Sequence, residues 1–168
     1  MPIFHTPDVT RRVALQFAAL GLASLAACRS ETTAEPRPLR VLFVCQFGSV
    51  KSPIARELLR RRAKEMGVRV IVNSRGITPE EHINPDVART LASQSIDLAS
   101  DPLTALSSKD LTEADLVIAF NEIPPEFGAT NAVDWSDTPS MNDDYVNARA
   151  EFDRRIELLL HQLAKSGS

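Results

Sequence analysis

One cysteine in this sequence is placed where it could act as a nucleophile. Cys45 follows the apolar run 41–44, and after five intervening residues Lys51 and Ser52 begin a stretch that can form a helix. The intervening residues form a short loop: Gln46, Phe47, Gly48, Ser49 and Val50. Backbone N–H groups of such a loop and the positive end of a helix bind oxyanions such as phosphate, and they also stabilise a thiolate. The spacing therefore predicts a charged sulfur beside an anion-binding loop, with Ser52 donating a hydrogen bond to it.

Two of these residues have simpler interpretations. Cys45 could be a buried core thiol at the end of a strand, and Lys51 could be a solvated cation. The short loop and the helix that directly follow Cys45 favour the interpretation as a nucleophile, because they place anion-binding groups beside the sulfur.

The elements around Cys45 predict how it is positioned. The continuous apolar run 41–44 is typical of a strand buried on both faces of a parallel sheet. Ser52 and Pro53 offer an N-cap and a first-turn proline for a helix that ends at Gly67. Further strands are expected at 68–72, 116–120 and 132–134, and further helices at 85–95, 108–113 and 143–165. The alternation predicts an α/β fold, a three-layer sandwich with a four-stranded parallel sheet.

The stretch 41–59, VLFVCQFGSVKSPIARELL, resembles the low-molecular-weight protein tyrosine phosphatases. Their signature is a cysteine, five residues and then Arg-Ser-Pro, directly after a strand. The resemblance continues at 73–76, where Asn-Ser-Arg-Gly is similar to the family's Ser-Ala-Gly, and at 114–118, Ala-Asp-Leu-Val-Ile. Asp137, shortly before Pro139, lies where the family has an Asp-Pro loop. The likeness extends over about residues 39–163.

The resemblance implies a mechanism and a substrate class. Cys45 would attack phosphorus and form a phosphocysteine, while Asp137 would protonate the leaving oxygen and then activate water. The substrate would be a phosphomonoester, with phosphotyrosine as one candidate. Loop amides and a cation would balance the phosphoryl charge, so that neither a metal nor a cofactor is expected.

Several positions depart from the family pattern. Lys51 stands where the family has arginine, and an ammonium group cannot bind two phosphate oxygens side by side as a guanidinium does. We therefore expect weaker stabilisation of the transition state. Phe47 and Gly48 replace a Gly-Asn pair, which removes the asparagine that orders the loop. Thr138 is an extra residue directly after Asp137.

Three further residues can each be interpreted in two ways. Asp134 is an alternative to Asp137 as the general acid. Arg75 could supply the guanidinium that Lys51 lacks. Trp135 could line the pocket beside the acid, or it could pack in the core.

Two other functions compete with phosphatase activity. A protein that binds oxyanions without turnover would keep the loop and lose catalysis. An arsenate reductase would relay oxidation through additional cysteines, but the sequence contains only Cys28 and Cys45. The net charge of −3 gives no general basic field for nucleic acid, and the scattered histidines and cysteines do not have the spacing of a zinc site.

The first 28 residues have the pattern of an export signal. The arginine pair at 11–12 precedes the apolar stretch 13–27, which is shorter than the about 20 residues that span a bilayer. Residues 25–28, Leu-Ala-Ala-Cys, resemble the lipobox of bacterial lipoproteins, and the arginine pair resembles a twin-arginine signal. We thus expect a signal peptide at 1–27, a tether at 28–38 and a domain at 39–165. The protein would be held at a bacterial cell envelope through lipid on Cys28; the alternative is a cytoplasmic protein with an apolar N-terminal helix.

Overall fold

The domain is organised around a parallel sheet whose four strands have the order β2-β1-β3-β4. The computed structural model describes residues 37–83, 85–96, 98, 101–128 and 131–166. The expected signal peptide, Cys28 and most of the tether therefore lie outside the described residues. The strands are β1 (Leu39–Cys45), β2 (Val70–Gly76), β3 (Leu116–Ala119) and β4 (Val133–Asp134). The helices are α1 (Lys51–Met66), α2 (Pro85–Ser93), α3 (Ser108–Glu113), the short 3₁₀ helix η1 (Pro125–Phe127) and α4 (Tyr145–Ser166).

Strand β1 lies at the centre of the sheet. Val41 pairs with Val72 of β2 on one side and with Leu116 of β3 on the other, and both pairings are parallel. Parallel neighbours require a crossover connection, which here carries a helix between β1 and β2 and helices between β2 and β3. The carboxyl end of β1, where Cys45 stands, is thereby brought to the same edge as the ends of β2 and β3.

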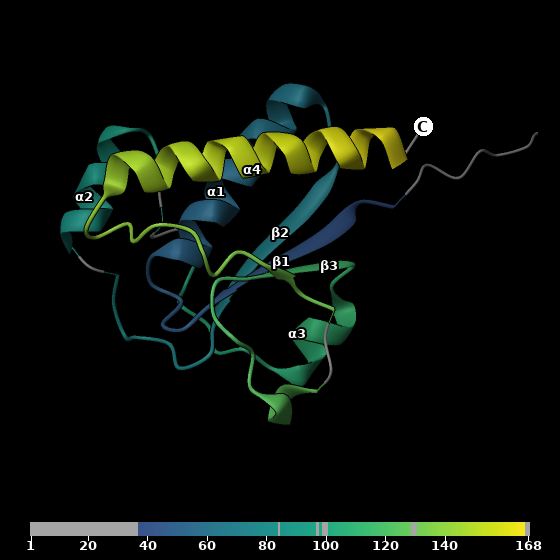
Figure 1. The fold of residues 1–168 in the computed structure, drawn as a ribbon, viewed down its shortest axis with the longest axis horizontal. Helices are drawn as coiled ribbons and strands as arrows, with labels where there is room; N and C mark the ends of the chain where they lie inside the picture. The colour runs from purple at the N-terminus through teal and green to yellow at the C-terminus, as the bar shows by residue number, and fades with distance from the viewer. Residues whose placement is uncertain (1–36, 84, 97, 99–100, 129–130, 167–168) are drawn as a thin grey trace, which may run out of the picture. The chain divides into compact units, whose positions relative to one another are not determined.

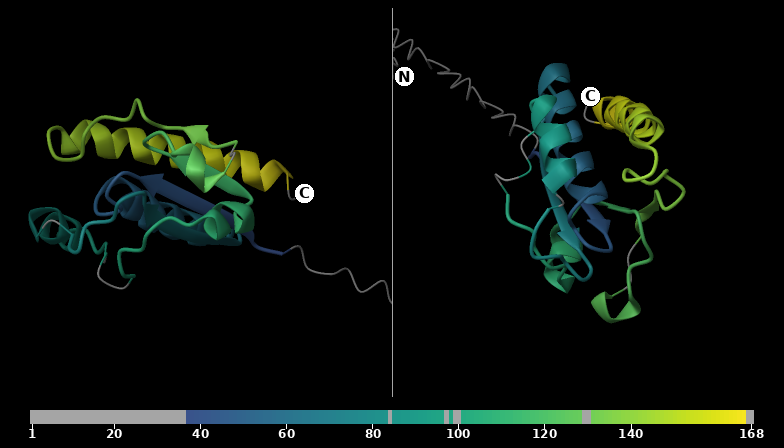
Figure 2. Two further views of the ribbon diagram at one scale, coloured as in Figure 1. Left: turned by 90° about the horizontal axis from the view of Figure 1, so that it is seen from below. Right: turned by 90° about the vertical axis from the view of Figure 1, so that its left-hand side faces the viewer.

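Helices cover both faces of the sheet, as the predicted three-layer α/β fold requires. Phe43 points toward α1 and α4 and is fully buried there, and a side chain of this size contributes about 2 kcal/mol when buried. Leu42 and Val44 point to the opposite face, where they pack with residues of the α3 segment. Figures 1 and 2 show α4 alongside α1, with α3 across the sheet from them. None of the described helices is long and apolar enough to cross a membrane.

Four aromatic rings fill the core beneath α4. Trp135 packs against Phe43, Phe120 and Phe152 with ring centroids 5.8, 5.9 and 6.5 Å away, and only 7% of its surface is exposed. This position agrees with the interpretation of Trp135 as a core residue.

Several element boundaries differ from the sequence-based expectation, most of them by one or two residues, and two of the differences affect residues near the end of β1. Helix α1 begins at Lys51 with Val50 as its N-cap, so Ser52 lies inside the first turn and does not cap the helix. Strand β2 covers residues 70–76 instead of 68–72, because the N–H of Val68 bonds to the carbonyl of Ala63 and closes the end of α1. Gly67 ends α1 as expected, in the left-handed conformation.

Candidate active site

The sulfur of Cys45 lies at the start of helix α1 among hydrogen-bond donors. The N–H of Gly48 donates to Sγ over 3.2 Å, and Oγ of Ser52 lies 3.1 Å from it. Ser52 is fully buried, and its Oγ is also 3.3 Å from the carbonyl of Arg75. The hydroxyl of Ser52 has one proton, so at any one time it donates either to the sulfur or to the carbonyl. The sulfur thus lies within reach of a backbone donor and of a hydroxyl at the N-terminal end of α1.

The loop after Cys45 is held by neighbouring segments on both sides. The N–H of Gln46 donates to Oδ1 of Asn121 over 2.9 Å, and its side-chain amide donates to the hydroxyl of Thr78 over 2.9 Å. The N–H of Glu80 donates to the carbonyl of Phe47 over 3.0 Å. Asn121 lies just beyond Phe120 at the carboxyl end of β3, while Thr78 and Glu80 follow β2. The loop is thus fixed by residues from the carboxyl ends of both neighbouring strands.

Two glycines allow this loop to lie directly on the end of β2. Gly48 has a φ of +68°, a conformation that glycine adopts without strain. A Cβ atom added to Gly76 would lie 2.8 Å from the nitrogen of Gly48 and 2.9 Å from the carbonyl carbon of Phe47. A Cβ atom added to Gly48 would lie 3.0 Å from Cα of Gly76, so both positions of this close approach favour glycine, where the resemblance had suggested only the loss of an ordering asparagine at position 48.

A pocket of about 200 Å³ opens above the sulfur. It is lined by residues of the loop, the end of β3 and the segment before α4: Cys45, Gln46, Phe47, Ser49, Val50, Lys51, Asn121, Ser140, Met141 and Asn142. Phe47 is 52% exposed at this pocket, which places an apolar ring beside the polar groups of the loop. The predicted loop residues are thereby brought together around one cavity.

Lys51 lines the same pocket, and its ammonium group is bound to the segment after β4. Its Nζ donates to the carbonyl of Thr138 over 2.9 Å and lies 5.9 Å from the ring centroid of Phe120. Burial lowers the pKa of Lys51 below its ordinary value, although the negative charges of Cys45 and Asp137 act in the opposite direction. The ammonium group is therefore placed between the loop of Cys45 and the loop that follows β4.

A family model described as low molecular weight phosphotyrosine protein phosphatase matches residues 40–166. The chain belongs to this family. The sequence matches none of the curated proteins with which it was compared.

Solved structures of the phosphatase family and of arsenate reductases share the fold. A low molecular weight protein tyrosine phosphatase from Bacillus subtilis has 22% identity, covers 76% of this chain and 98% of its own, and has a TM-score of 0.62. A mutant of the YwlE arginine phosphatase with a phosphorylated active-site serine has 22% identity, covers 76% and 97%, and has a TM-score of 0.60. A thioredoxin-dependent arsenate reductase from Corynebacterium glutamicum has 24% identity, covers 80% and 65%, and has a TM-score of 0.60.

The carboxylate expected to act as the acid of this phosphatase family does not line the pocket. Asp137 is 72% exposed at its side chain and accepts a hydrogen bond from Arg155 of α4 over 2.9 Å. Arg155 lowers the pKa of Asp137. The alternative, Asp134, accepts a hydrogen bond from the N–H of Ser136 over 2.7 Å and is likewise outside the pocket lining. Hydrogen bonds with Ser136 lower the pKa of Asp134.

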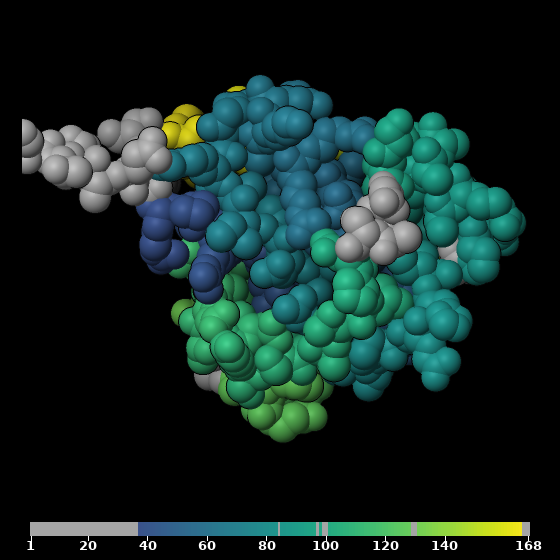
Figure 3. Space-filling model, turned by 180° about the vertical axis from the view of Figure 1, so that it is seen from behind, coloured from purple at the N-terminus to yellow at the C-terminus, as the bar shows by residue number. Residues whose placement is uncertain are grey.

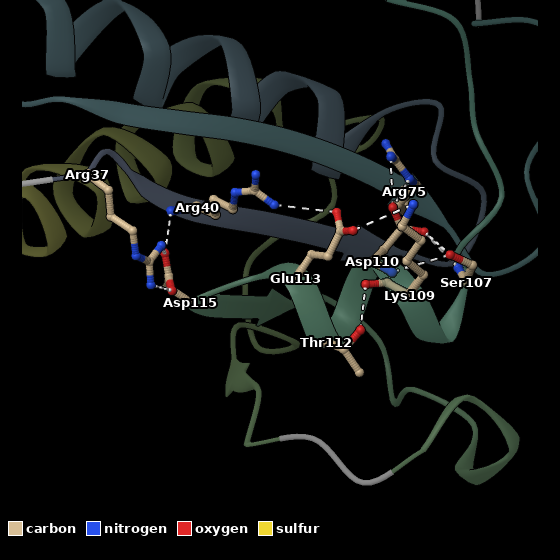
Figure 4. A network of polar contacts seen from close by, with 9 residues as sticks. All are labelled: Arg37, Arg40, Arg75, Ser107, Lys109, Asp110, Thr112, Glu113 and Asp115. Carbon is tan, nitrogen blue, oxygen red and sulfur yellow. Dashed lines mark hydrogen bonds and ion pairs between the residues drawn. The ribbon is translucent and has the colours of Figure 1, made fainter.

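Arg75 was hypothesised to supply a guanidinium to the anion-binding loop, but its side chain bonds to Asp110 of α3. Its Nε donates to Oδ1 of Asp110 over 2.8 Å, and another guanidinium nitrogen donates to the carbonyl of Ser74. Figure 4 shows the side chain of Arg75 turned toward α3, together with Arg40 and Glu113. These residues line a separate cavity of about 210 Å³ on the face where the green surface of the α3 segment meets β1 and β2 (Figure 3). The structure thus gives no support to Arg75 as the guanidinium of the anion-binding loop.

Four residues of the pocket were not foreseen from the sequence. Asn121 could have been found, since it directly follows a buried strand at the edge where parallel sheets bind ligands. No sequence signal marked Ser140, Met141 and Asn142, because they lie in an irregular segment whose path depends on how α4 packs.

Proposed function

We propose that the protein hydrolyses phosphomonoesters with Cys45 as the nucleophile. The observation that carries this proposal is the position of the sulfur, which accepts from the N–H of Gly48 and contacts the hydroxyl of Ser52 beneath a pocket. Membership of a phosphotyrosine phosphatase family supports a phosphorylated substrate. The exposed ring of Phe47 at the pocket supports an aryl phosphate such as phosphotyrosine as the preferred class.

The reaction would proceed in two displacements at phosphorus. The thiolate of Cys45 attacks in line and forms a phosphocysteine, and water then hydrolyses this intermediate. The hydroxyl of Ser52 stabilises the sulfur when it leaves in the second displacement, because a negatively charged sulfur accepts its hydrogen bond. Lys51 and the loop amides stabilise the charge on the phosphoryl oxygens.

The carboxylate that the resemblance implies as the proton donor for the leaving oxygen lies outside the pocket lining. The resemblance assigns this role to Asp137, but that carboxylate bonds to Arg155 and is not among the residues lining the pocket. To protonate a leaving oxygen in the pocket, the exposed carboxylate of Asp137 would have to leave Arg155.

A second candidate function is oxyanion binding with little turnover. It is favoured by Lys51, which stands in place of the family's arginine and directs its Nζ to the carbonyl of Thr138. An arsenate reductase would need a resolving thiol, and Cys28 is the only other cysteine of the sequence. Thiol relay is therefore the weakest of the three functions.

Steady-state hydrolysis of 4-nitrophenyl phosphate by the full-length chain tests the proposal. Cys45→Ser should lower kcat by at least about 10³-fold, because the serine hydroxyl is a far weaker nucleophile than the thiolate. Cys28→Ser is the matched control and should retain activity. Binding of inorganic phosphate without turnover dependent on Cys45 would instead establish the oxyanion-binding function.

We also propose that Cys28 carries the lipid anchor of a bacterial envelope protein. The support is the sequence of residues 25–28 after a short apolar stretch. A chain that remains in the cytoplasm is the alternative.

A further inference from the structure

The carboxylate of Asp137, in the loop after β4, is paired with a side chain of helix α4. Nη2 of Arg155 donates a hydrogen bond to Oδ2 of Asp137 over 2.9 Å. The side chain of Asp137 is 72% exposed, whereas that of Arg155 is 16% exposed. Within this pair the guanidinium is therefore the enclosed partner, and the carboxylate is the group that has room to turn.

Arg155 is also held by contacts that do not involve Asp137. Its Nε donates to Glu151 over 2.5 Å, and its guanidinium carbon lies 5.6 Å from the ring centroid of Trp135. Hydrogen bonds from Arg154 and Arg155 lower the pKa of Glu151 to about 2, so this partner stays ionised at neutral pH. Arg155 thus keeps its position whether or not Asp137 is bound to it.

The backbone that carries Asp137 is joined to the lining of the candidate pocket. The N–H and the hydroxyl of Thr138 both donate to the carbonyl of Trp135, over 3.1 and 2.6 Å, and close a turn that contains Asp137. The carbonyl of Thr138 accepts from Nζ of Lys51, a residue of the pocket lining. Asp137 therefore lies one residue from the contact that joins this turn to the pocket.

We propose that Arg155 is a positioning residue that holds the ionised carboxylate of Asp137 away from the substrate and releases it once it is protonated. This role rests on the proposed phosphatase function and on the general acid that the family resemblance implies. In the free enzyme Arg155 binds the carboxylate in its charged form, which has no proton to donate. A protonated carboxyl group has lost its charge attraction to the guanidinium, so it can turn to a leaving oxygen.

Bonds and protons balance in a cycle that begins with this release. The sulfur of Cys45 bonds to phosphorus while the bond from phosphorus to the leaving oxygen breaks, and the proton of Asp137 passes to that oxygen. Water then attacks phosphorus and gives a proton to the carboxylate of Asp137, while the sulfur leaves with the electron pair of the sulfur–phosphorus bond. Arg155 exchanges no proton, so it acts only on the fraction of Asp137 that is protonated and free.

The charged groups around Asp137 decide how its proton depends on pH. They come from three elements and are Arg154, Arg155 and Glu151 of α4, Asp134 of β4 and Lys51 of α1. Arg155 lowers the pKa of Asp137, mainly through the hydrogen bond. The protonated form that serves as the acid is lost as pH rises through this pKa, so removal of Arg155 should move the loss to higher pH.

The kinetics of Arg155→Gln on two substrates test this role in the full-length chain. On phenyl phosphate, whose leaving group needs protonation, kcat/KM at neutral pH should rise by about threefold or more. On 4-nitrophenyl phosphate, whose leaving group departs as a stable anion, kcat/KM should change by less than about twofold. The alkaline fall of kcat/KM on phenyl phosphate should lie at higher pH in the variant than in wild type, because this profile reports the acid of the free enzyme.

Three further variants separate this role from a structural one. Arg154→Gln is the matched control, because Arg154 also donates to Glu151 on the same helix, and it should change kcat/KM on either substrate by less than about twofold. Arg155→Met keeps an aliphatic chain against Trp135 but has no donor for Asp137, so it should show the same selective gain as Arg155→Gln. In an Asp137→Asn background, Arg155→Gln should give no gain.

A selective gain on phenyl phosphate in either Arg155 variant supports the role. It is overturned if neither variant gains, if both lose activity equally on the two substrates, or if the gain persists in Asp137→Asn. In these cases the phosphatase function stands as long as turnover of 4-nitrophenyl phosphate depends on Cys45. If wild type shows no turnover of either substrate that depends on Cys45, both the phosphatase function and the role of Arg155 are overturned.

Discussion

The guanidinium of Arg155 donates a hydrogen bond over 2.9 Å to the carboxylate of Asp137 and so links helix α4 to the loop after β4. The same guanidinium donates to Glu151 over 2.5 Å and lies 5.6 Å from the ring centroid of Trp135. One side chain thereby connects the acidic loop, its own helix and the aromatic core. The position of Asp137 depends on how α4 packs, which explains why sequence spacing alone did not place its carboxylate.

This ion pair should make stability depend on pH. Hydrogen bonds from Arg154 and Arg155 lower the pKa of Glu151 to about 2, and Arg155 lowers that of Asp137. Both carboxyls have a folded-state pKa below the unfolded value, so their stabilisation is present above pH about 4.5 and is lost as pH falls toward 2. Arg155→Gln should raise the pKa of both carboxyls, and Arg154→Gln mainly that of Glu151.

Carboxyl titration followed by NMR measures these shifts in the two variants. The bond to Asp137 itself should contribute little to the free energy of unfolding at pH 6, since this carboxylate is exposed and solvent screens the pair. A wild-type Asp137 that titrates at its ordinary value would show that the bond to Arg155 is not maintained in solution.

Gly76 should be the least replaceable glycine near the candidate site. In Gly76→Ala the added Cβ would lie 2.8 Å from the nitrogen of Gly48, so the backbone must move. We expect a loss of about 2–3 kcal/mol in the free energy of unfolding, at the upper end of what overpacking costs. Gly67→Ala is the control, because it meets no atom within 4 Å and introduces strain only through its φ of +68°, at a cost of about 1 kcal/mol. Denaturant unfolding compares the two, and an equal cost would contradict the close approach of the loop to β2.

Much of the fold could be predicted because its signals are local. The parallel α/β sheet was predicted from the apolar run 41–44 and from the alternation of strands with helices, and the structure confirms it. The end of α1 was predicted from Gly67 and is confirmed as well. The predicted range of β2 ended too early, at residue 72, because the second half of the strand, Asn73 to Gly76, is mostly polar. Those residues pair with β1 up to Cys45 opposite Gly76, and a periodic apolar pattern does not report such pairing.

The candidate site was predictable only where it follows a strand directly. The loop after Cys45 is short and leads into α1, so its residues could be placed from spacing alone. The directions of Lys51 and Arg75 could not, because each depends on a partner distant in sequence, the carbonyl of Thr138 and the carboxylate of Asp110. These long-range bonds decide which cation reaches the pocket.

The proposed lipid anchor can be tested in the bacterial host. Growth with a labelled fatty acid should give a labelled chain in wild type and an unlabelled one in Cys28→Ser, because lipidation requires the thiol at position 28. Cys45→Ser should be labelled like wild type. Wild-type chain that carries no label and is recovered from the cytoplasm would rule out the anchor and support the cytoplasmic alternative.

Asn121 should control both the order of the loop and its affinity for anions. Its Oδ1 accepts the N–H of Gln46 over 2.9 Å, and its side chain lines the pocket. In Asn121→Ala the N–H of Gln46 loses its acceptor, so we expect kcat on 4-nitrophenyl phosphate to fall by about 10-fold as the loop loses its fixed position.

Asn121→Asp separates the hydrogen bond from the charge of the pocket. The carboxylate can still accept from Gln46, but it adds a negative charge beside the bound anion, so inhibition by inorganic phosphate should weaken by about 10-fold or more. Asn73→Ala, on the opposite side of the sheet from α1, is the control for both variants and should leave kcat and phosphate inhibition unchanged. If phosphate inhibits Asn121→Asp as strongly as wild type, then the anion does not bind beside Asn121, and the pocket above Cys45 is not where phosphate is held.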